Sequence, residues 1–377
     1  MFIKIKEPVI KWAIEYSRKP LNVIVAKFKD AEKWEKESQD ITLSLTKAKS
    51  LASFLYVPFA FLLLDNPPAK INLEAEFRTI NNESTEEFSR DLSDTILDIK
   101  SKQGFLSEFR EENGYERISF PDISKDSPKE IMTLMGLAPG FQINNRLHDP
   151  ESVFAFVRQN LEKKGFVIFK SGIVGSNTRR KLNPKEFRGF ALKDSYAPLI
   201  FINRNDAPTA QNFTLIHEAI HLMKGDSNDL ISSDEETANE RMINGLVSEI
   251  LAPEEIIKDA WKSNDYQTDL ILRIGKIGRT LGLSIPVIAI RLKELDLISS
   301  EKCDEIVEED KANFVPQRKE KGGADYFDVV LSKLSSNFTA SVIDGINSEE
   351  LSITEGARLL GINPWKFFKL QERVEGK

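Results

Sequence analysis

The sequence predicts a mostly helical α+β fold in which a small sheet lies among many helices. Three observations support this prediction. Apolar residues recur at every third or fourth position through most of residues 1–164, which is the period of amphipathic helices. The period then shortens in Phe166–Phe169, Phe187–Leu192 and Pro198–Asn203, which are typical of buried strands. Helical periodicity returns directly after the third strand and continues, with polar interruptions, through the rest of the chain.

The composition is that of a soluble globular protein. The chain has 377 residues, of which 41% are hydrophobic and 29% charged, and this length predicts two or three domains. The only cysteine, Cys303, excludes a disulfide framework and indicates a reducing compartment. No signal peptide is expected, and the apolar run Phe54–Leu64 is too short to span a bilayer. We therefore expect a cytoplasmic protein that does not enter a membrane.

Residues 1–66 are expected to form four or five short helices, which is the size of a helix-turn-helix domain. The net charge of −7 argues against a general nucleic-acid binder, although residues 1–65 hold eleven Lys and Arg against eight Asp and Glu. The segment Lys29–Glu37 is rich in acid, whereas a recognition helix usually begins with Arg, Gln, Asn or Ser. A helical docking domain and a DNA-binding domain both stay open, with the acidic segment arguing against DNA.

Three further regions are expected. Residues 67–150 form a helical linker region that begins at two prolines and contains the long amphipathic helix Glu86–Glu112 and a second helix over Pro128–Leu137. Residues 151–307 hold the helix Ser152–Lys164, the three strands and the helices that follow. A polar linker over residues 308–325 leads to a C-terminal helical module, residues 324–377. In that module Ser352–Asn363 has helix-turn-helix spacing, for which packing or protein docking is the favoured interpretation.

The strongest chemical signal is an H-E-x-x-H pattern at His217–His221. Positions four apart lie on one face of a helix, so His217 and His221 can offer their imidazoles to a single ion, with Glu218 placed to take a proton from water. Asp206 and Pro208 mark the expected start of this helix, and Gly225 marks its end. The pattern also arises by chance in helices that bind nothing. Because the chain has only three histidines, however, two of them at this spacing around a Glu favour a metal site.

A catalytic zinc keeps three protein ligands, so a third ligand must come from elsewhere in the chain. Cysteine is not available near the motif, which leaves a carboxylate. Glu240 lies at the edge of the apolar face of the next expected helix, Glu235–Leu251, where an unpaired carboxylate would be costly. Asp226, Asp229 and Asp234 are weaker candidates because they fall in the polar stretch between the two helices. The sequence therefore predicts His217, His221 and Glu240 as the metal ligands.

The stretch from His217–His221 to Glu240–Pro253 resembles the ImmA/IrrE family of metallo-endopeptidases, in which an H-E-x-x-H helix is followed by a Glu-x-x-x-Asn helix that ends in a Leu-x-Pro-like sequence. The approach over Glu186–Leu192 and Tyr196–Asn203 is similar as well. The segment Val57–Pro68 resembles the end of the repressor-type (XRE-like) helix-turn-helix domain that such proteins carry ahead of the peptidase. The likeness is most specific in residues 186–253.

The resemblance implies a thermolysin-like (gluzincin) metallopeptidase core that uses Zn²⁺ to cleave a helix-turn-helix repressor or an antitoxin-like protein. Genes of a mobile element or a stress response would then be derepressed. His217, His221 and Glu240 would hold the zinc, and Glu218 would act as base and proton shuttle. The group that stabilises the oxyanion stays open among Arg179, Arg180, Arg188, Tyr196 and His148, and for His148 a solvent-exposed loop histidine is the favoured interpretation.

A second class of function stays open. The protein could be a DNA-binding or antitoxin-like transcriptional regulator whose metal site is structural or sensory. The two hypotheses differ at Glu218, which only a hydrolase requires. The sequence does not give the substrate, the cleavage site, the activating signal or the oligomeric state.

Overall fold

The computed structural model describes residues 2–17, 19–36, 39–57, 59–67, 88–120, 127–224, 233–264, 269–313 and 325–376. The chain divides into two compact units, Met1–Ile96 and Leu97–Lys377, and the division falls inside helix α6 (Arg90–Glu112). Among the described helices, none combines the length and the apolar character needed to cross a membrane. The domain boundaries expected at residues 66, 150, 307 and 324 stay predictions.

The first unit is built mainly of short helices, as expected, but it also contains two strands that the sequence analysis did not predict. The strands pair antiparallel, with Phe2 opposite Ser44 and Ile5 opposite Ile41. Its elements are β1 (Phe2–Ile5), α1 (Glu7–Ser17), α2 (Leu21–Lys27), α3 (Ala31–Lys36), β2 (Ile41–Ser44), α4 (Leu45–Leu55) and η1 (Phe59–Leu63).

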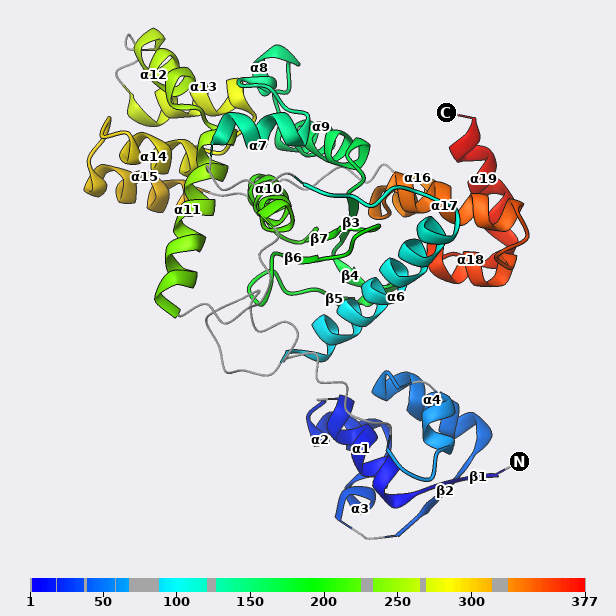
Figure 1. Cartoon of the computed structure of the whole chain (residues 1–377). Helices are drawn as coiled ribbons and strands as arrows, with labels where there is room; N and C mark the ends of the chain where they lie inside the picture. Colours follow the sequence, from blue (N-terminus) through cyan, green and yellow to red (C-terminus); the bar gives the residue numbers. More distant parts are fainter. Residues whose placement is uncertain are drawn as a thin grey trace. The chain divides into compact units, whose positions relative to one another are not determined.

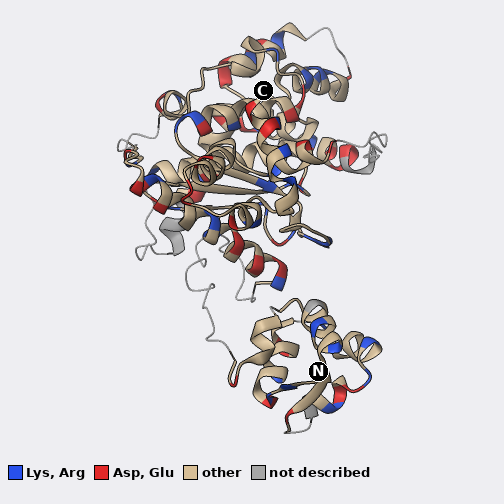
Figure 2. Ribbon diagram, turned by 90° about the vertical axis from the view of Figure 1, so that its right-hand side faces the viewer, with Lys and Arg blue, Asp and Glu red and all other residues tan. Residues whose placement is uncertain are grey.

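One apolar core holds the first unit together. Ile5, Ile10, Ile24, Leu51 and Leu55 are fully buried in it, and each comes from a different turn of the chain or a different element. Basic and acidic residues are interspersed along the ribbon of this unit (Figure 2). Helices α2 and α3 follow one another with a short turn between them, but the assignment of this unit as a helix-turn-helix domain stays a prediction.

The second unit contains the expected strands within a shell of helices, which confirms the mostly helical α+β class. The elements up to the sheet and through it are α7 (Pro128–Met135), α8 (Phe141–Asn144), α9 (Pro150–Lys163), β3 (Val167–Ser171), β4 (Ile173–Val174), β5 (Asn177–Lys181), β6 (Gly189–Leu192) and β7 (Leu199–Asn203). Those that follow are α10 (Pro208–Lys224), α11 (Ser233–Leu251), α12 (Glu254–Ser263), α13 (Leu270–Leu281), α14 (Ile285–Glu294), α15 (Ser300–Asn313), α16 (Tyr326–Lys333), α17 (Ser336–Asn347), α18 (Ile353–Leu360), η2 (Pro364–Lys366) and α19 (Phe367–Glu375).

The central sheet has the strand order β3-β7-β6, with β7 parallel to β3 and antiparallel to β6. Every residue of β7 is buried, which explains its continuous apolar sequence. Helix α10 follows β7 directly and packs across β6 and β7, while α9 packs beside α10 (Figure 1). The H-E-x-x-H helix therefore rests on the sheet, and its apolar residues enter the main core of the unit.

The sequence analysis did not predict two elements of this unit and ended a third too early. The chain after β3 forms the hairpin β4–β5, which turns at Gly175 with φ 53°. The short helix α8 lies before α9. Residues 308–313, expected as linker, continue helix α15. In that helix the buried Cys303 and Ile306 pack into the core, so tertiary contacts favour the helix despite its polar sequence.

The C-terminal helices α16 to α19 pack on α9 and β3 of the second unit. The carboxylate of Glu162, on α9, accepts hydrogen bonds from the backbone N and the hydroxyl of Ser336 at the start of α17. The fully buried ring of Phe338 lies edge-on to Phe105 and to Phe169 of β3. These helices therefore form part of the same compact unit as the sheet.

Helix α10 approaches the sheet closely because Gly189 has no side chain. A Cβ built at Gly189 lies 2.6 Å from Thr214 Cγ2 and 2.8 Å from the backbone oxygen of Phe201. Since the backbone oxygen cannot yield, we expect Gly189→Ala to lower the free energy of unfolding by about 1–3 kcal/mol, as measured by denaturant unfolding. Gly104→Ala is the control: its Cβ meets nothing within 4 Å on helix α6, so it should be neutral or slightly stabilising. Equal unfolding midpoints for both variants would contradict this packing argument.

Candidate metal centre

The side chains that anchor α10 are polar groups at its first turn. Gln211 Nε2 donates to the backbone oxygens of Asp206 at 2.7 Å and Arg204 at 3.1 Å, and Asn212 Nδ2 donates to Pro150 O at 3.0 Å. Both side chains are buried, so these bonds satisfy donors that water cannot reach. They fix the start of α10 against the end of β7 and the start of α9. As expected from Asp206 and Pro208, the helix begins at this point.

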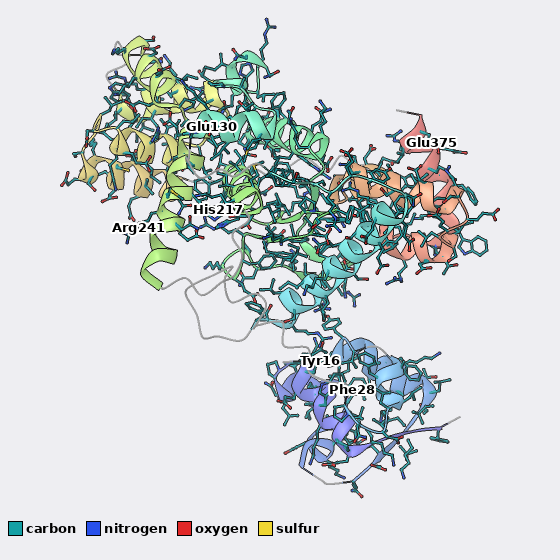
Figure 3. The ribbon with its side chains drawn as sticks, viewed as in Figure 1. Tyr16, Phe28, Glu130, His217, Arg241 and Glu375 are labelled. Atoms are coloured by element: carbon teal, nitrogen blue, oxygen red, sulfur yellow. The ribbon has the colours of Figure 1, made fainter. Side chains whose placement is uncertain are left out.

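Three side chains bring metal-binding atoms together beside α10. His217 Nε2 and His221 Nε2 lie 3.0 Å apart, as the four-residue spacing requires. Glu240, from α11, brings one carboxylate oxygen to 3.4 Å from His217 Nε2 and the other to 3.2 Å from His221 Nε2. Figure 3 shows His217 in this position, between α10 and α11, with Arg241 further out on α11. The structure therefore brings together the three residues that the sequence singled out.

The electrostatics of this group suit a cation. Hydrogen bonds to His217 and His221 hold the pKa of the Glu240 carboxyl far below its usual range, so that it is ionised at neutral pH. Glu218, which is partly buried, behaves in the opposite way. Burial raises the pKa of its carboxyl, the nearby histidines oppose this shift, and the charge of Glu240 adds to it. Two carboxylates in one site thus have pKa values pushed apart, an arrangement that separates a ligand from a base.

The spacing of the donors matches the size of a coordinated metal ion. Bonds of 2.0–2.1 Å at tetrahedral angles place neighbouring ligand atoms about 3.3 Å apart, close to the three separations here. The ligand atoms all lie within 4.8 Å of one another, and two imidazoles with one carboxylate form a donor set that zinc accepts. Among the described residues this is the group of His, Cys, Asp and Glu side chains that could hold a metal. The residues present therefore fit a metal ion.

Comparison with known proteins relates this site to a family. Residues 161–293, about a third of the chain, match the model of the Peptidase_M78 family, the IrrE N-terminal-like domain. This segment is similar to an IrrE N-terminal-like domain. It contains all three donors and Glu218, and it confirms the resemblance to ImmA/IrrE-type peptidases for this part of the chain. Searches of the curated proteins and of the solved structures gave no significant match.

Gln142 and Arg291 hold the C-terminal end of α11 in the IrrE N-terminal-like segment. The sequence analysis did not single out either residue. Gln142, on α8, is fully buried and donates to Leu251 O at 2.6 Å. Arg291, on α14, donates to Ala252 O at 2.9 Å and pairs with the Glu249 carboxylate. They satisfy carbonyls at the end of the helix that carries Glu240. A sequence signal existed for Arg291, because it lies between buried apolar residues of α14, where a charge needs a partner.

The ring of His217 is oriented by packing. Its Nδ1 atom is buried and makes no hydrogen bond within the described residues. The Phe213 ring, one turn earlier on α10, stacks against the imidazole at a centroid distance of 6.1 Å. Phe213 thus helps to turn Nε2 toward the other donors, which is the role that a hydrogen bond to the second nitrogen serves in many metal sites.

The remaining candidates from the sequence are the expected helix end, the weaker ligand candidates and the candidates for oxyanion stabilisation. Gly225, Asp226 and Asp229 lie outside the described residues, and Asp234 falls in the first turn of α11. The candidates for oxyanion stabilisation lie in different places. Arg188 Nε lies 3.7 Å from an Asp206 carboxylate oxygen, and the Tyr196 hydroxyl accepts a hydrogen bond from Arg117. On β5, Arg179 is exposed and Arg180 is buried, and His148 is exposed before α9. The oxyanion role of these residues stays a prediction.

Proposed function

We propose that the protein is a zinc-dependent endopeptidase that cleaves a helix-turn-helix repressor or an antitoxin-like protein and so derepresses genes of a mobile element or a stress response. The convergence of His217, His221 and Glu240, with Glu218 adjacent on α10, is the observation that supports a hydrolytic zinc site. The peptidase class of the domain supports it independently.

In this proposal each residue has one task. His217, His221 and Glu240 would hold the zinc, which when bound supplies Lewis acidity to the scissile carbonyl and to the attacking water. Glu218 removes a proton from that water and passes it to the nitrogen of the leaving amine, so the same carboxylate acts first as base and then as acid. Its partly buried position limits competition from solvent. After a full cycle the carboxylate of Glu218 is deprotonated again, as it was at the start.

The edge of the sheet offers a binding mode for the substrate backbone. Asn203 N donates to Arg188 O at 2.8 Å, so these two residues form a hydrogen-bonded pair of the ladder. Hydrogen-bonded pairs alternate along antiparallel strands, so Phe190 and Phe201 form the next such pair. The backbone groups of Gly189 and Ala191 therefore point away from β7. Because β6 is the last strand of the sheet and supports α10, an extended peptide that added to β6 as a strand would run alongside the metal helix. A binding mode based on backbone hydrogen bonds suits a protein substrate.

Zinc removal tests the metal requirement. We expect the purified protein to contain one zinc per chain and to cleave the helix-turn-helix repressor encoded beside its gene. Treatment with a chelator should abolish cleavage, because the Lewis acid is lost, and added zinc should restore it. The measurements are metal content by atomic absorption and cleavage by gel electrophoresis with mass spectrometry of the products.

The outcomes separate the two classes of function. Absence of zinc from freshly purified protein would overturn the enzymatic proposal. A different result would favour a regulator with a sensory metal site. In that case the protein binds zinc but cleaves neither the repressor nor any other helix-turn-helix protein encoded nearby, and its DNA binding changes when zinc is removed.

A further inference from the structure

Helix α18, the short element η2 and helix α19 come last in the chain, and one side of η2 and α19 is exposed. Helix α18 ends at Gly361, whose φ of 69° turns the chain, and Asn363 begins the next helix by accepting a hydrogen bond from Trp365 N at 3.1 Å. Element η2 leads directly into α19. Phe367 and Leu370 are fully buried and fix the inner side of α19 on its neighbours. Figure 1 shows α19 on the outer side of the C-terminal helices.

The outer side of η2 and α19 carries exposed aromatic residues. Trp365 is 90% exposed and Phe368 is 59% exposed, which makes Trp365 the most exposed of the large hydrophobic residues within the described chain. Tyr326 and Val329, on the adjacent α16, are exposed as well. Trp is enriched among the residues that dominate binding energy at protein interfaces. A surface of this kind indicates a partner.

The exposed line along α19 is complementary to itself. Trp365, Lys369, Glu372 and Gly376 follow one another at spacings of four, three and four residues, and all four are exposed. Lys369 and Glu372 therefore share one face of α19, while Trp365 lies in η2 just before this helix and Gly376 caps its end. When two copies of such a helix pack antiparallel about a two-fold axis beside Leu370 and Gln371, Trp365 lies opposite Gly376 of the partner subunit. Lys369 then lies opposite Glu372 of the partner subunit. The large ring meets the residue with no side chain, and each cation meets an anion.

We propose that this face is a homodimer interface in which α19 packs antiparallel against α19 of a second copy. The aromatic rings of Trp365 and Phe368 on two copies would supply roughly half of the about 1,000 Å² that a specific interface needs. Duplex DNA is the less favoured occupant, because Glu372 and Glu375 lie on the same exposed side and Arg373 is already paired with Asp328 at 3.0 Å. The proposal is independent of the peptidase activity.

A charge exchange tests the antiparallel pairing directly. Sedimentation velocity over a dilution series should show a monomer–dimer equilibrium for the wild-type chain. Lys369→Glu and Glu372→Lys should each weaken the dimer roughly fivefold, because each creates two like-charged contacts across the axis. The double variant K369E/E372K restores opposite charges and should recover the wild-type dissociation constant. Trp365→Ala should weaken the dimer roughly tenfold or more.

Leu272→Ala is the control, since Leu272 is 52% exposed on α13, away from this helix pair, and its loss should leave the dimer unchanged. All substitutions fall on exposed positions, and circular dichroism checks that the variants fold. A wild-type chain that stays monomeric at every concentration overturns the proposal. A dimer that is insensitive to Trp365→Ala and to the charge reversals also overturns it. Retardation of duplex DNA by the monomer, lost in Trp365→Ala, would assign the surface to DNA instead.

Discussion

Under the proposed function, Glu218→Gln is expected to slow cleavage of the proposed repressor substrate by about 10²–10⁴-fold without loss of zinc. The amide has the size of the carboxyl group but cannot accept a proton from water, so the chemical step loses its base. Glu218 is not one of the three clustered residues, which are His217, His221 and Glu240. Metal content and the unfolding transition should therefore stay close to those of the wild type. Single-turnover cleavage measured beside zinc stoichiometry gives both quantities on one preparation.

Glu255→Gln provides a matched control for this substitution. Glu255 is an exposed residue in the first turn of α12, and its amide variant should cleave at the wild-type rate. Full activity in Glu218→Gln would show that another group moves the proton, and it would remove the argument for hydrolysis at this site.

Glu240→Ala is expected to lose both the metal and the activity. The carboxylate bridges the two imidazoles, with one oxygen 3.4 Å from His217 Nε2 and the other 3.2 Å from His221 Nε2. Its removal leaves two neutral ligands and no compensating charge. Because the loss of residues that only orient ligands already lowers metal affinity by about 10–100-fold, the loss of a ligand should lower zinc affinity by more than about 100-fold. Competition with a fluorescent chelator measures the affinity.

Arg241→Ala is the control on the same helix. Arg241 follows Glu240 on α11 and is exposed, so its substitution should leave zinc affinity and cleavage unchanged. If Glu240→Ala kept one tightly bound zinc per chain, the third ligand would have to come from another residue, and the assignment of Glu240 would be wrong.

The parts of the fold with a local signal could be predicted from the sequence. Helix α10 combined a start at Asp206 and Pro208 with strong apolar periodicity, and the three strands of the main sheet were short apolar runs. The position of Glu240 at the edge of a buried face identified it as a ligand candidate, because a carboxylate there needs a partner. The family match, limited to residues 161–293, covers this same part of the chain.

The parts that were missed depend on distant contacts. Strands β1 and β2 have four residues each and pair across nearly forty intervening positions without a tight turn to mark them. Only the folded chain shows that the amide of Gln142 reaches Leu251, or that Arg291 reaches Ala252. Helix α15 has a polar sequence whose few apolar residues happen to be buried. Such features carry almost no signal within a short window.

The hydrogen bonds from Gln142 and Arg291 to the end of α11 also bear on the order of folding. Gln142 lies 109 positions before its acceptor, and Arg291 lies 39 positions after its own. The helix that presents Glu240 is thus tied to chain segments made well before it and well after it. Contacts of such long sequence separation form only once most of the unit has collapsed. The candidate metal centre should therefore assemble late, so that a nascent chain still emerging from the ribosome would lack the complete set of ligands.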